Sequence, residues 1–261
     1  MKNKKEILSN YPYLIWVAFY ATLFWLIFGA SRMSFAIVLI VYTLSIILAC
    51  TPCAELIWRK FKGVRRVATQ REKDRLLPIF EEVYQEALRI DKYLFKHIKL
   101  FIKDTMEINA FAFGQETLVI TKGSINQLSD EDLKGLIVHE FCHFSNYDTI
   151  VILFASISNI LMESFLRFIC WITKPVAFIH NIVNGIRKAL VFIGDLILMR
   201  ASRKNEYIAD IFAEKCGYQE NLINTLYQFY ETSMSEPKKI IEQLRSTHPP
   251  LVNRIEKLEN I

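Results

Sequence analysis

The chain has 261 residues, of which 52% are hydrophobic, and it carries a formal net charge of +5. This composition permits a buried core, and the absence of internal repeats and low-complexity linkers excludes a repeat array. A basic chain can indicate a nucleic-acid surface. Here the basic residues gather beside an apolar segment, where anionic lipid headgroups hold them, so we expect no nucleic-acid binding.

Two uncharged apolar segments lie near the N-terminus. No charged residue occurs between Glu6 and Arg32 or between Arg32 and Glu55, and each gap can cross a hydrocarbon core of about 30 Å. We expect two membrane-spanning helices, from about Tyr13 to Phe28 and from about Phe35 to Cys50. A cleaved signal peptide is the alternative for the first segment. The second span directly after it favours an uncleaved anchor.

Basic residues set the expected orientation of these spans. Lysines precede the first span, a single arginine lies in the turn, and a basic cluster follows the second span. This cluster consists of Arg59, Lys60, Lys62, Arg65, Arg66, Arg71, Lys73 and Arg75. By the positive-inside rule, the N-terminus and everything after residue 55 face the cytoplasm, which predicts a multi-pass protein of the inner, cytoplasmic membrane.

Residues 50–53, Cys-Thr-Pro-Cys, have the spacing of a redox motif, which makes a thiol-disulfide protein an alternative from a different class. That motif requires a strand before it and a helix after it. Here it lies at the end of a membrane span. The five cysteines say little about disulfides, because the soluble part of the chain is expected to face the reducing cytoplasm.

The following segments predict a mainly helical catalytic part with a small sheet. Residues 70–90 have the periodicity of an amphipathic helix, and residues 97–103 and 117–121 have that of strands. Helical patterns return at residues 220–232 and 237–244.

A helix that begins with Ser129 and three acidic residues carries His139, Glu140 and His143. Histidines at i and i+4 present two imidazoles on one face, and Glu140 lies about 100° away on the same turn. This is the geometry of a zinc peptidase. The alternative is an ordinary amphipathic helix. Val138 and Phe141 are expected to be buried, which keeps bulk water away.

A catalytic zinc ion takes three protein ligands and leaves one position open. The best third ligand is Glu206, one helical turn before Asp210. One of these carboxylates can bind the metal while the other accepts a hydrogen bond from the far nitrogen of a bound imidazole. A charged, solvated helix face is the alternative. One Zn²⁺ per chain is expected.

Residues 150–172 and 176–199 are apolar but carry polar stripes. Glu206 must lie on the same side of the membrane as His139, so both segments cross it or neither does. Crossing is expected, and the polar stripes then face each other or an aqueous cavity, since intramembrane charges are costly unless they are paired. In the alternative, neither segment crosses, and the stripes face solvent or headgroups.

An antiparallel hairpin that turns near Pro175 would bring Glu163 towards Arg187 or Lys188. Asp148 is expected to cap or brace the histidine-bearing helix, and no chemical role is assigned to it.

Five blocks occur in a recognisable order: residues 109–114, 117–123, 139–143 with Asp148, 206–210, and 247–250 with Arg254, Ile255 and Leu258. Together they resemble the integral-membrane zinc metallopeptidases typified by HtpX and the CaaX prenyl protease, a branch of the gluzincins. The resemblance covers roughly residues 105–258.

The resemblance implies roles for five further residues. His248 and Arg254 match positions that stabilise the tetrahedral oxyanion, where developing negative charge favours a cation or an imidazole donor. For His248, the alternative is a plain turn before the final helix. Asn109, Ala110 and Phe111 resemble the strand to which an extended peptide substrate adds by main-chain hydrogen bonds.

The expected fold is a mainly α, membrane-anchored α+β metallopeptidase of zincin type, with an N-terminal transmembrane hairpin and a small β-sheet. Its predicted parts are residues 1–55 (hairpin), 56–149 (first catalytic part), 150–199 (hydrophobic hairpin) and 200–261 (second catalytic part).

The resemblance to HtpX implies a zinc endopeptidase that removes misfolded or membrane-associated polypeptides at the cytoplasmic face. Glu140 would act as general base. Prenyl-protein trimming is less favoured, because those enzymes build a large multi-span chamber and this chain is short. A dedicated maturation protease for one membrane peptide is an alternative. A non-catalytic membrane scaffold is another, but it would be expected to lack Glu140 or a metal ligand.

Overall fold

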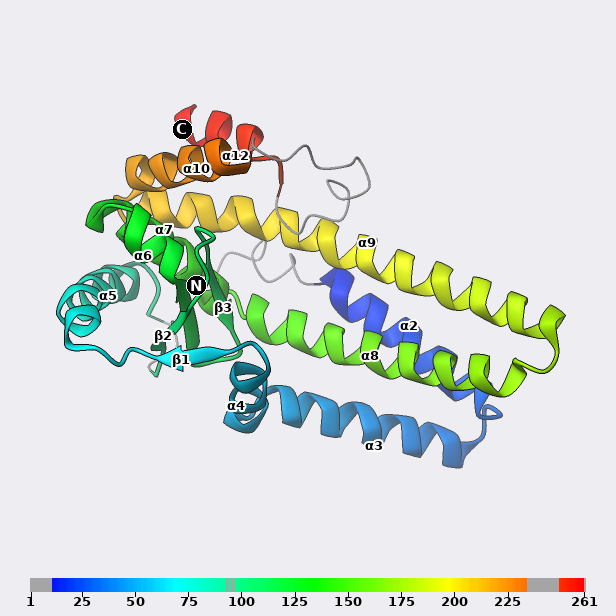
Figure 1. Cartoon of the computed structure of the whole chain (residues 1–261). Helices are drawn as coiled ribbons and strands as arrows, with labels where there is room; N and C mark the ends of the chain where they lie inside the picture. The colour runs from blue at the N-terminus through cyan, green and yellow to red at the C-terminus, as the bar shows by residue number, and fades with distance from the viewer. Residues whose placement is uncertain (1–10, 93, 95–96, 234–248, 261) are drawn as a thin grey trace. The chain divides into compact units, whose positions relative to one another are not determined.

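The computed structural model describes residues 11–92, 94, 97–233 and 249–260, and the chain divides into two compact units (Figure 1). The helical unit comprises the segment that ends at Ala49 together with Val151–Ser202. The mixed unit comprises Cys50–Ile150 together with the segment that begins at Arg203.

The helical unit contains α2 (Tyr11–Ile27), α3 (Arg32–Ala49), most of α8 (Asp148–Thr173) and the first part of α9 (Ala177–Lys215). All four apolar segments predicted from the sequence are therefore helical. Their inner faces form a separate apolar core, which includes Tyr13, Tyr20, Phe154 and Met162.

Polar side chains inside the helical unit pair with one another. Trp16 donates its indole N–H to Asn159 Oδ1 at 2.9 Å. Arg187 donates to Glu163 Oε1 at 2.6 Å, which confirms the contact expected from an antiparallel hairpin of α8 and α9. Arg167 reaches the same Glu163 oxygen at 2.7 Å. Pairing removes much of the cost of placing these charges among apolar helices.

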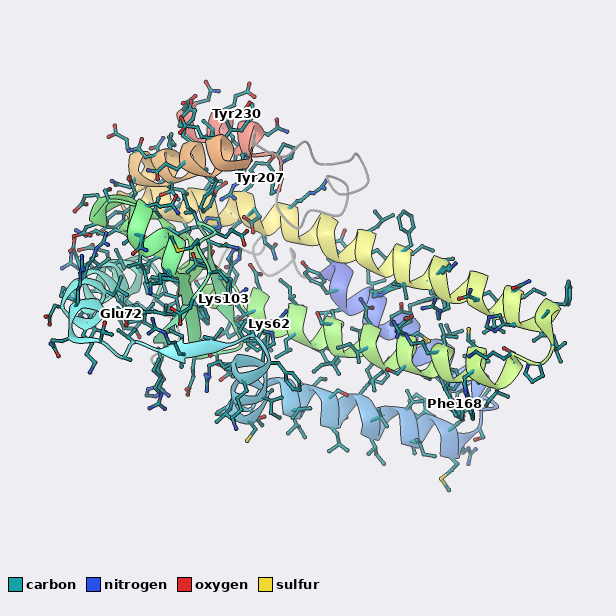
Figure 2. The ribbon with its side chains drawn as sticks, in the orientation of Figure 1. Lys62, Glu72, Lys103, Phe168, Tyr207 and Tyr230 are labelled. Atoms are coloured by element: carbon teal, nitrogen blue, oxygen red, sulfur yellow. The ribbon has the colours of Figure 1, made fainter. Side chains whose placement is uncertain are left out.

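Within the described residues, α8 is the helix that is long and apolar enough by itself to cross a membrane. The helix α3 qualifies together with α4 (Pro52–Phe61) as a bent pair, and α2 is a shorter apolar helix of 17 residues. Apolar side chains project outward along α3 (Figure 2). They include Met33, Phe35, Ile37, Leu39, Ile40 and Leu44.

The mixed unit is built on a four-stranded sheet in the order β1-β2-β4-β3. The strands are β1 (Val64–Arg66), β2 (Lys99–Lys103), β3 (Ala110–Phe113) and β4 (Thr117–Thr121). The two central strands are parallel, and both outer pairs are antiparallel. Among the described strands, β3 therefore occupies a sheet edge.

Helix α7 (Asp130–Ser145) is central to the mixed unit, since it contacts α5 (Gln70–Ile90), α10 (Gln219–Ser233) and β3. The unit also contains the short helices α4, α6 (Lys122–Gln127) and α12 (Leu251–Glu259), together with the last part of α9. The shared core includes Val83, Leu118, Ile137, Phe141 and Leu226. The helices expected at residues 70–90 and 220–232 are confirmed.

Two boundaries differ from the sequence prediction. The apolar segment expected to end at Met199 continues without a break, and α9 runs to Lys215 and carries Glu206 on the same helix. No glycine or proline between Met199 and Glu206 interrupts the helical hydrogen bonds. The first central strand begins at Lys99 instead of His97. The helix predicted at residues 237–244 lies outside the described residues.

The turn between β3 and β4 is fastened to α4 by Glu55. Its carboxylate accepts hydrogen bonds from the backbone N–H of Gln115 at 2.6 Å and from the Thr117 hydroxyl at 2.6 Å. Gly114, in this turn, has φ +62°, a left-handed conformation that favours glycine. A side chain at this position would collide with the Glu55 carboxylate.

We expect Gly114→Ala to destabilise the protein more than Gly63→Ala. Both residues have nearly equal left-handed φ values, +62° and +64°, so both variants carry a backbone strain of about 1 kcal/mol. Only at Gly114 does the new methyl group meet Glu55, which adds about 1–3 kcal/mol of overpacking. Thermal unfolding of the detergent-purified proteins measures the difference. Equal shifts in the unfolding midpoint would show that Glu55 does not constrain this turn.

Candidate active site

The helix that carries the histidines is fixed at its start and buried along most of its length. Ser129 is its N-cap, and its hydroxyl accepts a hydrogen bond from the backbone N–H of Asp132 at 3.1 Å. Acidic residues in the first turn complement the helix dipole. Val138 and Phe141 are fully buried, as predicted, so the face that carries His139 and Glu140 is held in place by packing on the opposite side.

The two imidazoles converge on one distant carboxylate. The Nε2 atom of His139 lies 3.3 Å from Glu206 Oε2, and the Nε2 atom of His143 lies 3.6 Å from Glu206 Oε1. Ligand atoms about 2.0–2.1 Å from a tetrahedral zinc ion stand about 3.4 Å apart. Two imidazole nitrogens and a carboxylate oxygen at these separations fit Zn²⁺.

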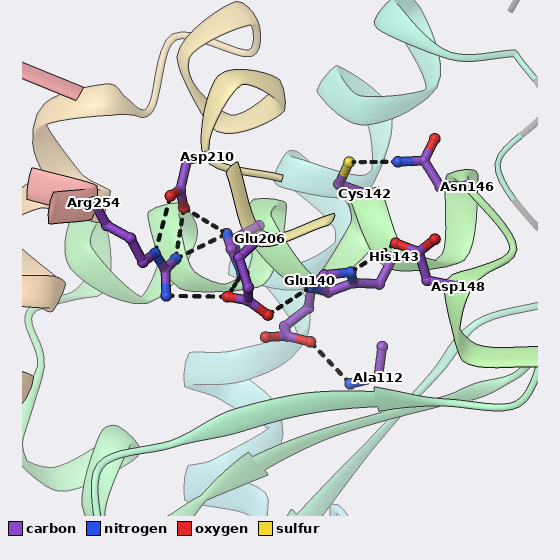
Figure 3. Close-up of polar contacts among 10 residues, drawn as sticks. Ala112, Glu140, Cys142, His143, Asn146, Asp148, Glu206, Asp210 and Arg254 are labelled. Atoms are coloured by element: carbon purple, nitrogen blue, oxygen red, sulfur yellow. Dashed lines mark hydrogen bonds and ion pairs between the residues drawn. The ribbon is translucent and has the colours of Figure 1, made fainter. Parts of the chain in front are cut away.

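Each imidazole is oriented by a second carboxylate that contacts its other nitrogen (Figure 3). Asp210 Oδ1 lies 3.1 Å from His139 Nδ1, and Asp148 Oδ2 lies 3.1 Å from His143 Nδ1. A carboxylate at Nδ1 fixes the tautomer that leaves the Nε2 lone pair for a metal. Asp210 was predicted for such a contact.

Asp148 was not given this role from the sequence. It lies five residues after His143, a spacing that does not place two side chains together on one helix. Helix α7 ends at Ser145, and Tyr147 adopts a left-handed φ of +62° before α8 begins. This turn brings the Asp148 carboxylate back to the His143 ring, and only the presence of an acidic residue after the motif could have indicated it.

Arg254 from α12 contacts Glu206 and Asp210, which both lie on α9. Its Nε and Nη2 donate to the two oxygens of Asp210 at 2.9 and 2.5 Å, and its Nη1 lies 3.1 Å from Glu206 Oε2. The residue is only 4% exposed. The guanidinium therefore braces the two acidic residues that face the imidazoles.

Glu140 lies between the histidines and the sheet. The metal-binding atoms of His139, Glu140 and His143 are all within 4.8 Å of one another. Glu140 Oε2 also accepts a hydrogen bond from the backbone N–H of Ala112, on the edge strand β3, at 2.9 Å (Figure 3). A buried carboxylate is thus held beside both the candidate metal ligands and a strand edge.

The register of β3 shows which of its backbone groups point away from the sheet. Asn109 accepts a backbone hydrogen bond from Thr121 at 3.0 Å. Because facing directions alternate along an antiparallel pair, the backbone groups of Phe111 also face β4, and those of Ala110 and Ala112 face the outer edge. Of the predicted substrate-binding residues, Asn109 lies just before the strand, and Ala110 and Phe111 are its first two residues.

The predicted oxyanion donor His248 lies outside the described residues. Cys142, between the two histidines, is buried, and its sulfur accepts a hydrogen bond from Asn146 Nδ2 at 3.3 Å.

The charges around the site shift the pKa values of its residues. Burial lowers the pKa of His143, but the nearby carboxylates of Asp148 and Glu206 outweigh it and raise the value to about 9. Burial also lowers the pKa of His139, and contacts with Asp210 and Glu206 again raise it overall. Both rings therefore bind protons tightly when no metal is bound.

Comparisons with known proteins agree with this geometry. The sequence profile of peptidase family M48 matches residues 71–261. A protease HtpX homolog of Dictyoglomus thermophilum is 28% identical over 188 residues, which cover 61% of this chain and 62% of that protein. A protease HtpX homolog of Listeria monocytogenes is 30% identical over 211 residues, which cover 62% of this chain and 67% of that protein.

The chain thus spans about 62% of the length of the first curated relatives that it matches. Among solved structures, the crystal structure of S. mikatae Ste24p superposes with a TM-score of 0.59 at 18% sequence identity. The match covers 93% of this chain and 62% of that chain, and it shows a shared fold.

We expect Asp148→Asn and Asp210→Asn each to lower the affinity for Zn²⁺ by about 10–100-fold, because each removes the carboxylate that orients one imidazole. Titration against a competing chelator measures the affinity. Asp74→Asn, a change at an exposed carboxylate on α5, is the control and should leave it unaltered. Wild-type affinity in both test variants would exclude an orienting role for these residues.

Zinc affinity should depend steeply on pH. Protons compete with the metal for His143, whose pKa is about 9 in the metal-free protein, so the protonated ring must release its proton before it can bind. We expect the logarithm of the affinity to rise by about one unit or more per pH unit from about pH 7 to about pH 9. In Asp148→Asn the rise should end at lower pH. An affinity that does not change over this range would contradict the expectation.

Proposed function

Because the chain belongs to peptidase family M48, we propose that it is a zinc-dependent endopeptidase that hydrolyses misfolded or membrane-associated polypeptides at the cytoplasmic face of the membrane. One observation carries the proposal: the Nε2 atoms of His139 and His143 both lie next to the carboxylate of Glu206, which comes from a distant helix. Glu140 lies beside the two imidazoles. A buried cluster of this kind has little use in a purely structural protein, since burying charged groups is costly.

In this proposal His139, His143 and Glu206 hold one Zn²⁺ per chain. The ion would supply Lewis acidity, which lowers the pKa of the attacking water and polarises the peptide carbonyl. Asp148 and Asp210 hold the rings in the orientation that binding requires.

Glu140 is proposed as the general base. Its carboxylate takes the proton of the attacking water and later passes it to the leaving amine. The hydrogen bond from Ala112 supports this role, because it places the carboxylate directly beside the strand to which a peptide would add.

The outer edge of β3 is proposed to bind the substrate backbone. An extended peptide would pair with the outward-facing backbone groups of Ala110 and with the carbonyl of Ala112, because the Ala112 N–H is already donated to Glu140. Asn109 and Phe111 face β4 with their backbone groups, so we propose that they fix the strand and that their side chains contribute to the site.

Arg254 was expected to stabilise the oxyanion. Its contacts support a different role: it positions Glu206 and Asp210, because those two carboxylates occupy its guanidinium group. His248 remains the proposed donor to the oxyanion, on the strength of its place in the Thr-His-Pro-Pro segment.

Membrane anchoring is also part of the proposal. The outward apolar surface of α3 and the length of α8 support insertion in a bilayer, and we propose that α2 and α3 form an N-terminal transmembrane hairpin and that α8 and α9 cross as a second one. The basic residues after α3 favour a cytoplasmic location for the mixed unit.

A maturation protease for one membrane peptide is the alternative function. Capture of a single small peptide by a Glu140→Gln protein in its native membrane would favour this alternative, whereas capture of many polypeptides favours quality control. A non-catalytic scaffold is disfavoured, since the three proposed ligands and the proposed base lie together in one largely buried cluster.

We expect Glu140→Gln to retain zinc and to lose about 10²–10⁴-fold in the rate of casein cleavage, because the proton acceptor is removed and the ligands are kept. His143→Ala should lose both zinc and cleavage. Zinc content and cleavage are measured on detergent-purified protein.

Glu131→Gln, at an exposed position on the same helix, is the control for these variants and should behave like the wild type. Wild-type cleavage by Glu140→Gln would rule out the proposed mechanism.

A further inference from the structure

The short helix α4 has two opposite faces. With 3.6 residues per turn, Glu55 and Trp58 fall on one side, and Leu56, Ile57 and Phe61 fall on the other. The first side packs on the β3–β4 hairpin, and the second is exposed.

The inner face of α4 packs against the edge strand β3. The Trp58 ring stacks on Phe113 with the ring centres 4.0 Å apart and lies edge-on to Phe111 at 5.6 Å. Glu55 is 2% exposed and binds the turn after β3, and Arg59 donates to the Thr117 hydroxyl at 2.7 Å. Glu55 and Trp58 have no part in the proposed catalytic mechanism. Their contacts instead attach α4 to the β3–β4 hairpin.

Among the residues that the structure describes, none covers the apolar side chains on the outer face of α4. Phe61 is 87% exposed, and Leu56 and Ile57 are about half exposed. Lys60 is exposed on the same face, between Leu56 and Ile57 around the helix axis, and the exposed Lys62 is the C-cap residue. An exposed apolar stripe with lysines in it and next to it is typical of a helix that lies in the interface of an anionic membrane, because lysine side chains can extend to the headgroups.

We propose that α4 is an interfacial helix that binds the surface of an anionic lipid bilayer and thereby holds the edge strand β3 next to the membrane. The proposal deepens the proposed function, on which it rests, by defining the substrate as a polypeptide segment that is tethered to the bilayer. Glu55 and Trp58 are positioning residues in this scheme, since they link the lipid-binding face to the strand that receives the substrate.

The order of the helices along the chain indicates that the outer face of α4 contacts the bilayer. Only Cys50 and Thr51 separate α4 from the end of α3, and between Met33 and Leu48 the exposed side chains of α3 are apolar except for Thr43. If α3 spans the membrane, α4 must begin at its surface, because two residues extend over only about 7 Å. The exposed lysines then meet anionic headgroups, and the apolar stripe meets the acyl boundary.

Membrane depth at residue 61 tests the inference directly. The full-length protein, with Cys50 and Cys53 changed to serine and Phe61→Cys labelled with a fluorophore, is reconstituted in bilayers of phosphatidylcholine and phosphatidylglycerol. Lipids that carry a nitroxide near the headgroup should quench this probe strongly. The same label at Glu220→Cys, an exposed position on α10, is the control and should be quenched less.

Equal quenching at the two positions would overturn the proposed membrane contact. This readout needs no catalysis, so it remains decisive even if the protein proves not to be a peptidase. Loss of quenching at residue 61 in pure phosphatidylcholine would identify the lysines as the main contribution, and retention would identify the apolar stripe. Both results support the membrane contact.

The consequence for substrates is tested by comparing one peptide in two forms, free in solution and linked to a lipid. The double variant Ile57→Glu with Phe61→Glu should slow cleavage of the lipid-linked peptide about fivefold or more and leave the free peptide's rate unaltered, because only the membrane contact is weakened. Equal loss on both peptides, or no loss on either, would overturn the link between α4 and substrate choice.

Discussion

The site depends on a set of buried charges that compensate one another. Two imidazoles face Glu206, and their far nitrogens are held by Asp148 and Asp210. An isolated carboxylate at this depth would be very costly, whereas paired and hydrogen-bonded groups are tolerated. The carboxylates therefore have two effects. They pair with the imidazole nitrogens in the protein interior, and they orient both Nε2 atoms towards one point, as metal binding requires.

The site also requires two segments that follow the histidine-bearing helix at a distance along the chain, α9 and α12. Glu206 and Asp210 come from α9, and Arg254, which braces them, comes from α12. The sheet also borders the site, since the backbone N–H of Ala112 in β3 donates to Glu140. The proposed general base therefore lies beside the strand edge proposed for peptide binding, and Glu55 of α4 holds the turn that follows this strand.

Much of the fold could be predicted from local pattern alone. The helix at residues 70–90 is marked by its apolar period, and its capping box at Thr69 and Glu72 is present in the structure. The histidine-bearing helix and its buried face were equally predictable. The continuation of α9 from an apolar segment to Glu206 was missed, because the change in composition near residue 200 resembled a boundary although nothing there breaks a helix.

The sequence by itself determined the helical segments, the pair of imidazoles with Glu140, and the expectation that Glu206 and Asp210 would join them, because i to i+4 spacing is a local property of one helix. Only the tertiary structure decided that Asp148 turns back to His143, that Arg254 braces Glu206 and Asp210, and that Glu140 meets Ala112. These contacts join residues whose separations along the chain follow no helical or strand period, so they arise only when the packed elements bring the side chains together.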